Sequence, residues 1–203
     1  MKFCIIYDCD SEQDEKTIKK FFSSIFAFLN GVLLFSESNK ILLINNKQIV
    51  FDSEIHEDFN IIFKKSMYPV RTGDIGYALI LKPDIIVACT MFKDNLDFNN
   101  LLNCIKAASQ MNIRIDTFCL EESNGLKLLS NGTNGLFIKN DFQDLLRILY
   151  EDKNTNLHTE FNVKCYCCKK DTKIGYCCPI CLTIYCKFTP ICKKCKIKFN
   201  CAK

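Results

Sequence analysis

Along residues 1–152, apolar positions follow two patterns: short continuous runs, and longer segments in which apolar residues recur every three or four positions. Continuous runs are typical of strands buried on both faces of a parallel sheet, and the second spacing is typical of helices with one apolar face. The runs Lys2–Cys9, Asp84–Thr90, Ile113–Leu120 and Leu136–Ile138 therefore predict strands.

The segments between these strands predict helices. In the first, apolar residues keep helical spacing from Ile18 to Leu29, Ser11 stands at the N-cap position, Glu12, Asp14 and Glu15 follow in the first turn, and Gly31 marks the end. The other predicted helices are Ile55–Lys65, Gly73–Lys82, Asp97–Gln110, Asn124–Ser130 and Phe142–Tyr150.

Three short apolar segments follow the first helix and predict strands with an antiparallel hairpin at the sheet edge: Val32–Phe35, Ile41–Ile44 and Ile49–Phe51. Strands that alternate with helices predict an open, mostly parallel α/β sheet with helices on both faces. No apolar run reaches the roughly 18 residues that cross a bilayer. We expect an α/β domain at 1–152, a polar linker at 153–163 and a small C-terminal module at 164–203.

The C-terminal module is rich in cysteine. Two C-x-x-C pairs, Cys178/Cys181 and Cys192/Cys195, each direct two sulfurs at one spot, and together they make the S4 shell that a structural Zn²⁺ accepts. A second S4 site is an open alternative for the other cysteines of the module, namely Cys165, Cys167, Cys168 and Cys186. Cys177 and Cys201 have no evident partners and are interpreted as spare thiols.

Disulfides are the competing interpretation of these cysteines. The chain has 15 cysteines, an odd number, and the apolar start before Asp8 is too short for a signal peptide, so we expect a reducing compartment, cytosol or nucleus. A segment of this size cannot bury a sufficient core of its own, which also favours a metal.

Charge is divided unevenly along the chain. Residues 164–203 hold ten Lys and one Asp, giving +9, whereas residues 1–163 hold 17 basic and 22 acidic side chains, giving −5. Each Zn(Cys)4 centre adds −2, so the module would keep +7 with one zinc and +5 with two. Such a charge could attract nucleic acid or an acidic protein surface, or could simply form a solvated rim.

Candidate chemistry in the α/β domain is sparse. The loop after the first strand carries Asp8, Asp10 and Glu12, which with Thr72 and Asp74 could hold Mg²⁺ or Ca²⁺. The favoured alternative is that these acids start a helix. The phosphate-binding, dinucleotide-binding and nucleophile-elbow motifs are absent, and neither His56 nor His158 lies near a nucleophile pattern. The sequence therefore does not indicate an enzyme.

Several stretches resemble one known family. The Cys-Tyr-Cys-Cys and Tyr-Cys-Cys-Pro-Ile-Cys segments, ending in Pro-Ile-Cys-Lys-Lys-Cys, resemble the C-terminal zinc finger of the smaller von Willebrand A-like subunit of the TFIIH core. Phe28–Val32, Ala107–Asp116 and Gly125–Phe137 agree in the family's order. Cys168 stands where relatives can have His. The loop Asp8-x-Asp10-x-Glu12 lacks the serines of the D-x-S-x-S motif that holds a metal in many von Willebrand A domains, which weakens the case for a metal there.

The resemblance implies a von Willebrand A fold with a C4 finger that matches Cys178, Cys181, Cys192 and Cys195. It implies a non-catalytic nuclear subunit acting in RNA polymerase II transcription initiation and nucleotide excision repair. The implied partners are the larger von Willebrand A subunit, which carries a RING-type zinc domain, and other TFIIH core subunits. The alternatives are a zinc module that binds DNA or RNA and, ranked last, a RING-like ubiquitin ligase.

Overall fold

The computed structural model describes residues 1–10, 12–55, 69–92, 96–139, 143–150, 163–172 and 175–199, and the chain divides into two compact units, Met1–Leu157 and His158–Lys203. We call them unit 1 and unit 2. Several predictions lie outside the described residues: the helix Ile55–Lys65 except Ile55, which lies in a turn, both histidines, Cys201 and all but the end of the linker.

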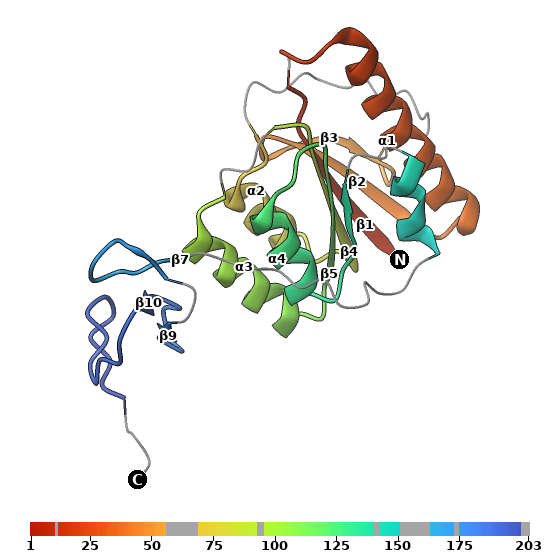
Figure 1. Ribbon diagram of the computed structural model, residues 1–203. Helices are drawn as coiled ribbons and strands as arrows, with labels where there is room; N and C mark the ends of the chain where they lie inside the picture. Colours follow the sequence, from red (N-terminus) through yellow and green to blue (C-terminus); the bar gives the residue numbers. More distant parts are fainter. Residues whose placement is uncertain are drawn as a thin grey trace. The chain divides into compact units, whose positions relative to one another are not determined.

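Unit 1 is built on a six-stranded sheet (Figure 1). Its strands are β1 (Lys2–Tyr7), β2 (Lys40–Asn45), β3 (Gln48–Asp52), β4 (Ile85–Thr90), β5 (Arg114–Cys119) and β6 (Phe137–Lys139). The spatial order is β3-β2-β1-β4-β5-β6, and every pair is parallel except β2 with β3. The predicted mostly parallel sheet with an antiparallel edge is confirmed.

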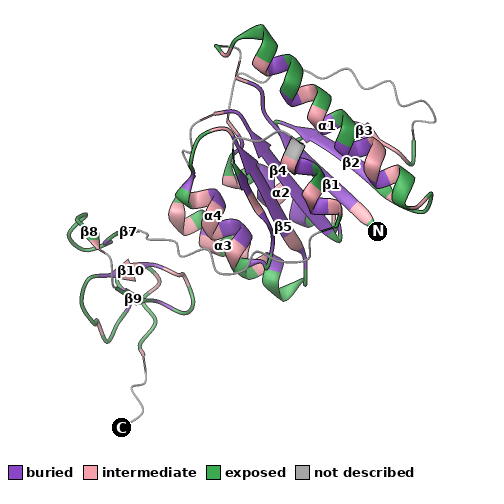
Figure 2. Cartoon of the chain, turned by 45° about the vertical axis from the view of Figure 1, so that its right-hand side comes forward, coloured by how far each residue is buried: buried purple, intermediate pink, exposed green. Residues whose placement is uncertain are grey.

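The central strands are buried on both faces because both faces are covered. Successive residues of β1 point to opposite sides, so Phe3, Ile5 and Tyr7 join one apolar cluster while Cys4 and Ile6 join the other. Figure 2 shows the resulting continuous buried colour along β1, β4 and β5. This is why these strands are continuous apolar runs in the sequence.

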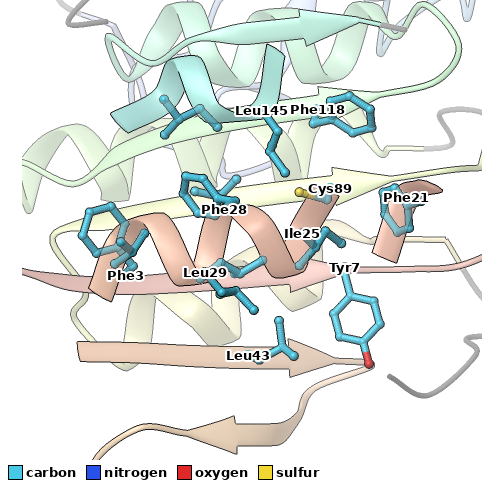
Figure 3. Packing of buried hydrophobic residues seen from close by; sticks show 14 of the residues in the cluster. Phe3, Tyr7, Phe21, Ile25, Phe28, Leu29, Leu43, Cys89, Phe118 and Leu145 are labelled. Carbon is cyan, nitrogen blue, oxygen red and sulfur yellow. The ribbon is translucent and has the colours of Figure 1, made fainter. Parts of the chain in front are cut away.

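Five helical segments cover the sheet: α1 (Glu15–Phe35), α2 (Thr72–Ile80), α3 (Phe98–Gln110), α4 (Asn124–Gly132) and the 3-10 helix η1 (Gln143–Leu149). On one face α1 packs with η1, and Phe21, Ile25 and Phe28 lie among the strand side chains (Figure 3). Helices α2, α3 and α4 supply the opposite cluster. The last segment was predicted as an ordinary helix, and the structure instead gives the tighter 3-10 form.

The first helix differs from its prediction at both ends. It begins at Glu15, because the Asp14 side chain accepts a hydrogen bond from Thr17 N at 3.0 Å and caps it. The predicted N-cap at Ser11 is therefore wrong, and of the three predicted first-turn acids only Glu15 lies in the first turn. The helix continues to Phe35, so the predicted strand Val32–Phe35 is wrong. Gly31 does not end the helix. A Cβ there would lie 2.6 Å from Leu149 Cδ1, so glycine allows η1 to pack closely.

The length of α1 also bears on the membrane question. Within the described part of the chain, α1 is the one helix long and apolar enough to cross a membrane, with a mean hydropathy of 1.5. The buried core helix of a globular domain passes the same test. One face of α1, from Ile18 to Val32, is buried in the apolar cluster that covers the sheet.

Unit 2 has very little apolar core. Its short strands β7 (Val163–Lys164) and β8 (Asp171–Thr172) pair antiparallel, as do β9 (Tyr176–Cys177) and β10 (Ile184–Tyr185). The cluster of buried side chains that the structure describes there consists of Cys178, Tyr185 and Cys192, with Cys181, Cys195 and Phe199 packed against it. Most of the unit is exposed, as the colours of Figure 2 show.

Candidate metal centres

Three tight turns of the same design supply most of the sulfurs. Each opens on a cysteine, Cys165, Cys178 or Cys192, whose carbonyl accepts a hydrogen bond from the N–H four residues later at 2.8–2.9 Å. The N–H of the same cysteine donates to the carbonyl five residues later at 2.9 Å. The fourth residue after each cysteine adopts a left-handed backbone, with φ of 60° at Lys169, 55° at Leu182 and 63° at Lys196. These bonds place the two sulfurs of each C-x-x-C pair on one side of a turn.

The eight predicted ligands gather into two groups, each with its sulfurs within 4.8 Å of one another. The first cluster is Cys178, Cys181, Cys192 and Cys195, and the second cluster is Cys165, Cys167, Cys168 and Cys186. The first cluster is the one predicted from the spacing, and the second is the set that the sequence left as an open alternative. They are also the only such groups of potential ligands among the described residues.

The sulfur spacing fits a tetrahedral ion. A Zn–S bond of about 2.3 Å places neighbouring sulfurs of a tetrahedron about 3.8 Å apart. In the first cluster, Cys178 Sγ lies 3.6 Å from Cys195 Sγ, and Cys181 Sγ lies 3.5 Å from Cys192 Sγ. In the second, Cys186 Sγ lies 3.6 Å from Cys167 Sγ and 3.8 Å from Cys168 Sγ, while Cys165 and Cys167 are closer, at 3.0 Å. None of the described cysteines is in a disulfide.

Each cluster contains at least one thiol whose pKa lies below its ordinary value. The hydrogen bond with Cys167, together with backbone N–H donors, lowers the pKa of Cys165 to about 5. Burial opposes the thiolate of Cys192, but the Cys195 N–H and the Tyr185 hydroxyl outweigh it and lower the pKa of Cys192 to about 6. Because a metal binds thiolate rather than thiol, these positions favour a first bond to an incoming cation.

Tyr185 is a contact residue that the sequence pattern did not reveal. Its side chain is 2% exposed, and its hydroxyl lies 3.3 Å from Cys192 Sγ and accepts the Lys193 N–H at 3.0 Å. The one available signal was an aromatic residue next to a cysteine, which is too common to single it out. Cys177 is exposed and lies outside both clusters.

The acidic loop after β1 has a different arrangement. Asp8 is buried, and its carboxylate accepts hydrogen bonds from Val70 N at 2.6 Å, Met91 N at 2.7 Å and the Thr90 hydroxyl at 2.5 Å. Burial raises the pKa of Asp8 to about 6 in spite of these donors. The carboxylate thus uses its lone pairs to hold the ends of three chain segments together.

The other candidates around this loop also have local partners. Asp10 accepts the Glu12 N–H at 2.9 Å, and Asp74 Oδ2 accepts the Arg71 N–H at 2.8 Å at the start of α2. Asp74 Oδ1 is buried with no partner among the described atoms. The structure does not bring Asp8, Asp10 and Glu12 together as a group of potential ligands within its described residues.

Comparison with known proteins adds a family. The family model described as "Transcription factor Tfb4" matches residues 64–196, more than half of the chain, and extends from unit 1 into unit 2. The chain is 30% identical over 119 residues to "General transcription and DNA repair factor IIH subunit tfb4" of Schizosaccharomyces pombe, covering 52% of this chain and 40% of that protein.

A second curated relative agrees. The chain is 27% identical over 135 residues to "General transcription factor IIH subunit 3" of Dictyostelium discoideum, covering 59% of this chain and 36% of that protein. The matches thus span about two fifths of the length of these relatives. Both relatives are named as subunits of the same transcription factor.

Solved structures support the fold. The SpRpn10 VWA domain superposes with a TM-score of 0.53 at 14% identity, covering 71% of this chain and 93% of that one. The TFIIH p34 N-terminal domain superposes with a TM-score of 0.51 at 18% identity, covering 73% and 95%. The expected von Willebrand A-like fold is confirmed, and the chain belongs to the Transcription factor Tfb4 family.

Proposed function

We propose that this protein is a non-catalytic structural subunit of the TFIIH core, acting in the nucleus in RNA polymerase II transcription initiation and nucleotide excision repair. The observation that carries the proposal is the family match over residues 64–196, which covers β4, β5 and β6 of the sheet and continues into the cysteine-rich unit. Its partners would be the larger von Willebrand A subunit with the RING-type domain and the other core subunits. In this organisation residues 1–152 form the von Willebrand A-like domain, 153–163 the linker and 164–203 the finger.

Zinc is the metal we propose for both clusters. Four thiolates at tetrahedral spacing select a soft, four-coordinate cation, and the charge of −2 left on each Zn(Cys)4 centre would be balanced by neighbouring lysines. When bound, the ion would supply cross-links that unit 2 cannot obtain from apolar packing. The turns that begin at Cys178 and Cys192 would hold the ion of the first cluster, and the turn that begins at Cys165, together with Cys186, would hold the ion of the second.

Exposed apolar side chains support a docking role for unit 1. After Lys20, α1 carries no charged residue, and near its end Leu34 is 87% exposed and Phe35 67% exposed. Large apolar groups at such exposure are covered in many assemblies by a partner. We propose that this end of α1 contacts another TFIIH core subunit.

Co-purification tests the scaffold. The full chain would be co-expressed with the TFIIH core subunits, with a Leu34→Glu/Phe35→Glu variant beside it and Lys19→Glu on the same helix as the matched control. We expect the wild type and the control to recover the TFIIH core subunits, including the larger von Willebrand A subunit, and the double variant to recover at least one of them at a tenth or less of the wild-type amount. Equal recovery by all three would exclude this surface, and no recovery by the wild type would exclude the scaffold.

A second candidate is nucleic-acid binding by unit 2. It is favoured by Lys193, Lys194, Lys196 and Lys198, which are all exposed. It predicts that the zinc-loaded chain binds DNA in a gel mobility-shift assay, with an affinity that falls steeply as the salt concentration rises. A chain that stays free of the core subunits yet binds DNA in this way would select this function over the scaffold.

A further inference from the structure

The two clusters are interleaved along the chain. The second cluster takes three sulfurs from Cys165–Cys168 and its fourth, Cys186, from the segment that joins the two turns of the first cluster. The two sites thus alternate along the chain, as in a cross-brace, but the second takes three sulfurs from one segment and one from another instead of two pairs. Cys186 lies in the chain between Cys181 and Cys192, two ligands of the first cluster. Metal binding at either site would therefore restrict the conformation of the segment that the two sites share.

Direct contacts reinforce this path. Cys186 N donates to Cys165 Sγ at 3.2 Å, and Tyr166 N donates to Ile184 O at 2.9 Å, so β10 is held against the first turn of the second cluster. The rings of Tyr166 and Tyr185 meet edge to face with centroids 5.9 Å apart. Tyr185 therefore precedes one ligand of the second cluster, Cys186, and its ring packs on Tyr166, which follows another ligand, Cys165.

The hydroxyl of Tyr185 reaches the other cluster. It lies 3.3 Å from Cys192 Sγ and accepts the Lys193 N–H at 3.0 Å. Since its oxygen already accepts that N–H, its own proton is available to the sulfur. A metal-bound thiolate has no proton to give, so in the loaded site Tyr185 donates and Cys192 accepts.

We propose that Tyr185 is a positioning residue that couples the two metal centres, so that the first cluster holds its ion more tightly when the second is filled. The proposal rests on both clusters binding metal. Tyr166 and Cys186 fix the position of the Tyr185 ring. Filling the second cluster would therefore hold the Tyr185 hydroxyl in place for its hydrogen bond to Cys192. Hydrogen bonds to ligands from residues outside the shell typically change metal affinity about 10–100-fold.

The first test is spectroscopic and uses the full chain loaded with ¹¹³Cd²⁺. The wild type is expected to give two resonances typical of CdS4 centres, assigned with Cys195→Ser and Cys167→Ser. Tyr185→Phe keeps the ring and removes the hydroxyl, so we expect the first-cluster resonance to shift and a competing chelator to remove that ion about 10-fold more readily. Tyr176→Phe is the matched control, because Tyr176 pairs with Tyr185 across β9 and β10 and is 55% exposed.

The outcomes separate the two proposals. Fewer than two CdS4 resonances in the wild type would overturn metal binding by both clusters. Two resonances that Tyr185→Phe leaves unmoved, with unchanged chelator competition, would overturn the role of Tyr185 while the metal centres stand. A shift of equal size in Tyr176→Phe would also count against it, because the effect would then be general to the hairpin.

The second test measures coupling. Cys167→Ser removes one ligand from the second cluster at a distance along the chain from Tyr185. We expect it to weaken cadmium binding at the first cluster about 5-fold or more in the wild-type background, the lower end of usual coupling factors, and to weaken it clearly less in Tyr185→Phe, where only the path of the chain still links the sites. Equal weakening in both backgrounds, or none in either, would overturn the proposal.

Discussion

Unit 1 and unit 2 reach a defined structure by different means. In unit 1 apolar side chains cover both faces of the sheet, and the buried carboxylate of Asp8 has partners within the chain at Val70, Thr90 and Met91. In unit 2 the buried cluster that the structure describes is two cysteines and one tyrosine. The apolar side chains of unit 1 stabilise it, whereas unit 2 has two clusters of potential ligands and, on our proposal, would depend on bound ions.

The energies explain the difference. Fully burying one large apolar side chain stabilises a fold by about 1.5–3 kcal/mol, and unit 1 buries many on each face. Binding of one structural zinc contributes about 10–16 kcal/mol. Two such ions would outweigh everything that Tyr185 and its few neighbours supply.

Metal removal is expected to have the largest effect, and it tests most directly whether unit 2 depends on metal while unit 1 does not. A strong chelator should unfold unit 2 and leave unit 1 intact, because the loss of about 10 kcal/mol or more falls on unit 2 alone. Thiol labelling followed by mass spectrometry measures this. The eight cluster cysteines should become reactive, while Cys4, Cys89 and Cys119, buried in the sheet, should stay protected as internal controls. Cluster cysteines that remain protected after chelation would contradict the dependence on metal.

A core substitution should produce the opposite pattern. Phe28 is fully buried in α1 against Phe3, with ring centroids 6.4 Å apart (Figure 3), so Phe28→Ala should destabilise unit 1 by about 3–5 kcal/mol. Phe26→Ala on the same helix, at a side chain 40% exposed, is the control and should change little. Urea unfolding followed by the isoleucine methyl NMR signals of β1 and β4 gives the free energy. Zinc content per chain should stay at the wild-type value in both variants.

The two units also differ in what their sequence reveals. The strands β1, β4 and β5 were predictable because strands covered on both faces must be apolar throughout. In Val32–Phe35 the same rule failed. Four consecutive apolar residues fit a strand or a buried helix equally well, and the choice was decided by α1, whose buried face continues through Val32. Gly31 was misread because its partner, Leu149, is distant in sequence.

In unit 2 the ligand types and pairs were predictable, and the links between them were not. The C-x-x-C spacing defines a turn that directs two sulfurs to one point, so the first grouping could be predicted from the sequence, whereas the second, which includes Cys167 and Cys186 outside any adjacent pair of this spacing, was only an open alternative. The contact of Tyr185 with Cys192 depends on how β10 crosses between the clusters. No local pattern encodes that path, because it results from closing both sites together.

Close backbone packing in unit 1 gives the next largest effect. A Cβ on Gly135 would lie 1.9 Å from the carbonyl oxygen of Ile115, so Gly135→Ala must displace β5 or β6 and should cost about 1–3 kcal/mol or more. Gly76→Ala in α2 is the matched control. A Cβ added at Gly76 would have nothing within 4 Å, so alanine should stabilise the helix by about 0.5–1 kcal/mol. The thermal unfolding midpoint of the zinc-loaded chain should fall for Gly135→Ala and rise for Gly76→Ala. An unchanged midpoint in Gly135→Ala would show that the sheet edge can shift to accommodate the methyl group at no cost.

Asp8→Asn gives the smallest expected effect. At pH 5 it should destabilise unit 1 by about 1–3 kcal/mol, because an amide nitrogen cannot accept from Val70 N or Met91 N. Asn45→Ala is the control, since it removes another side chain bonded to this end of β1, through Tyr7 O at 3.2 Å, without removing a titrating group. The measurement is urea unfolding at pH 4, 5, 6 and 7, followed by the methyl signals of β1 and β4.

The pH dependence of this variant decides whether unit 1 is free of ions at its own acidic loop. Burial raises the folded pKa of Asp8 to about 6, above the unfolded value of about 3.9. Between these values the folded state binds more protons, so the contribution of Asp8 to the free energy of unfolding falls as pH rises, by at most about 3 kcal/mol. The destabilisation caused by Asp8→Asn should therefore shrink from pH 5 to pH 7, whereas that of Asn45→Ala should stay level. Part of the wild-type slope persists in both because burial also raises the pKa of Asp116 to about 6. A destabilisation that grows toward pH 7 would mean that the charged carboxylate is stabilised, as by a bound cation, and unit 1 would then share the ion dependence of unit 2.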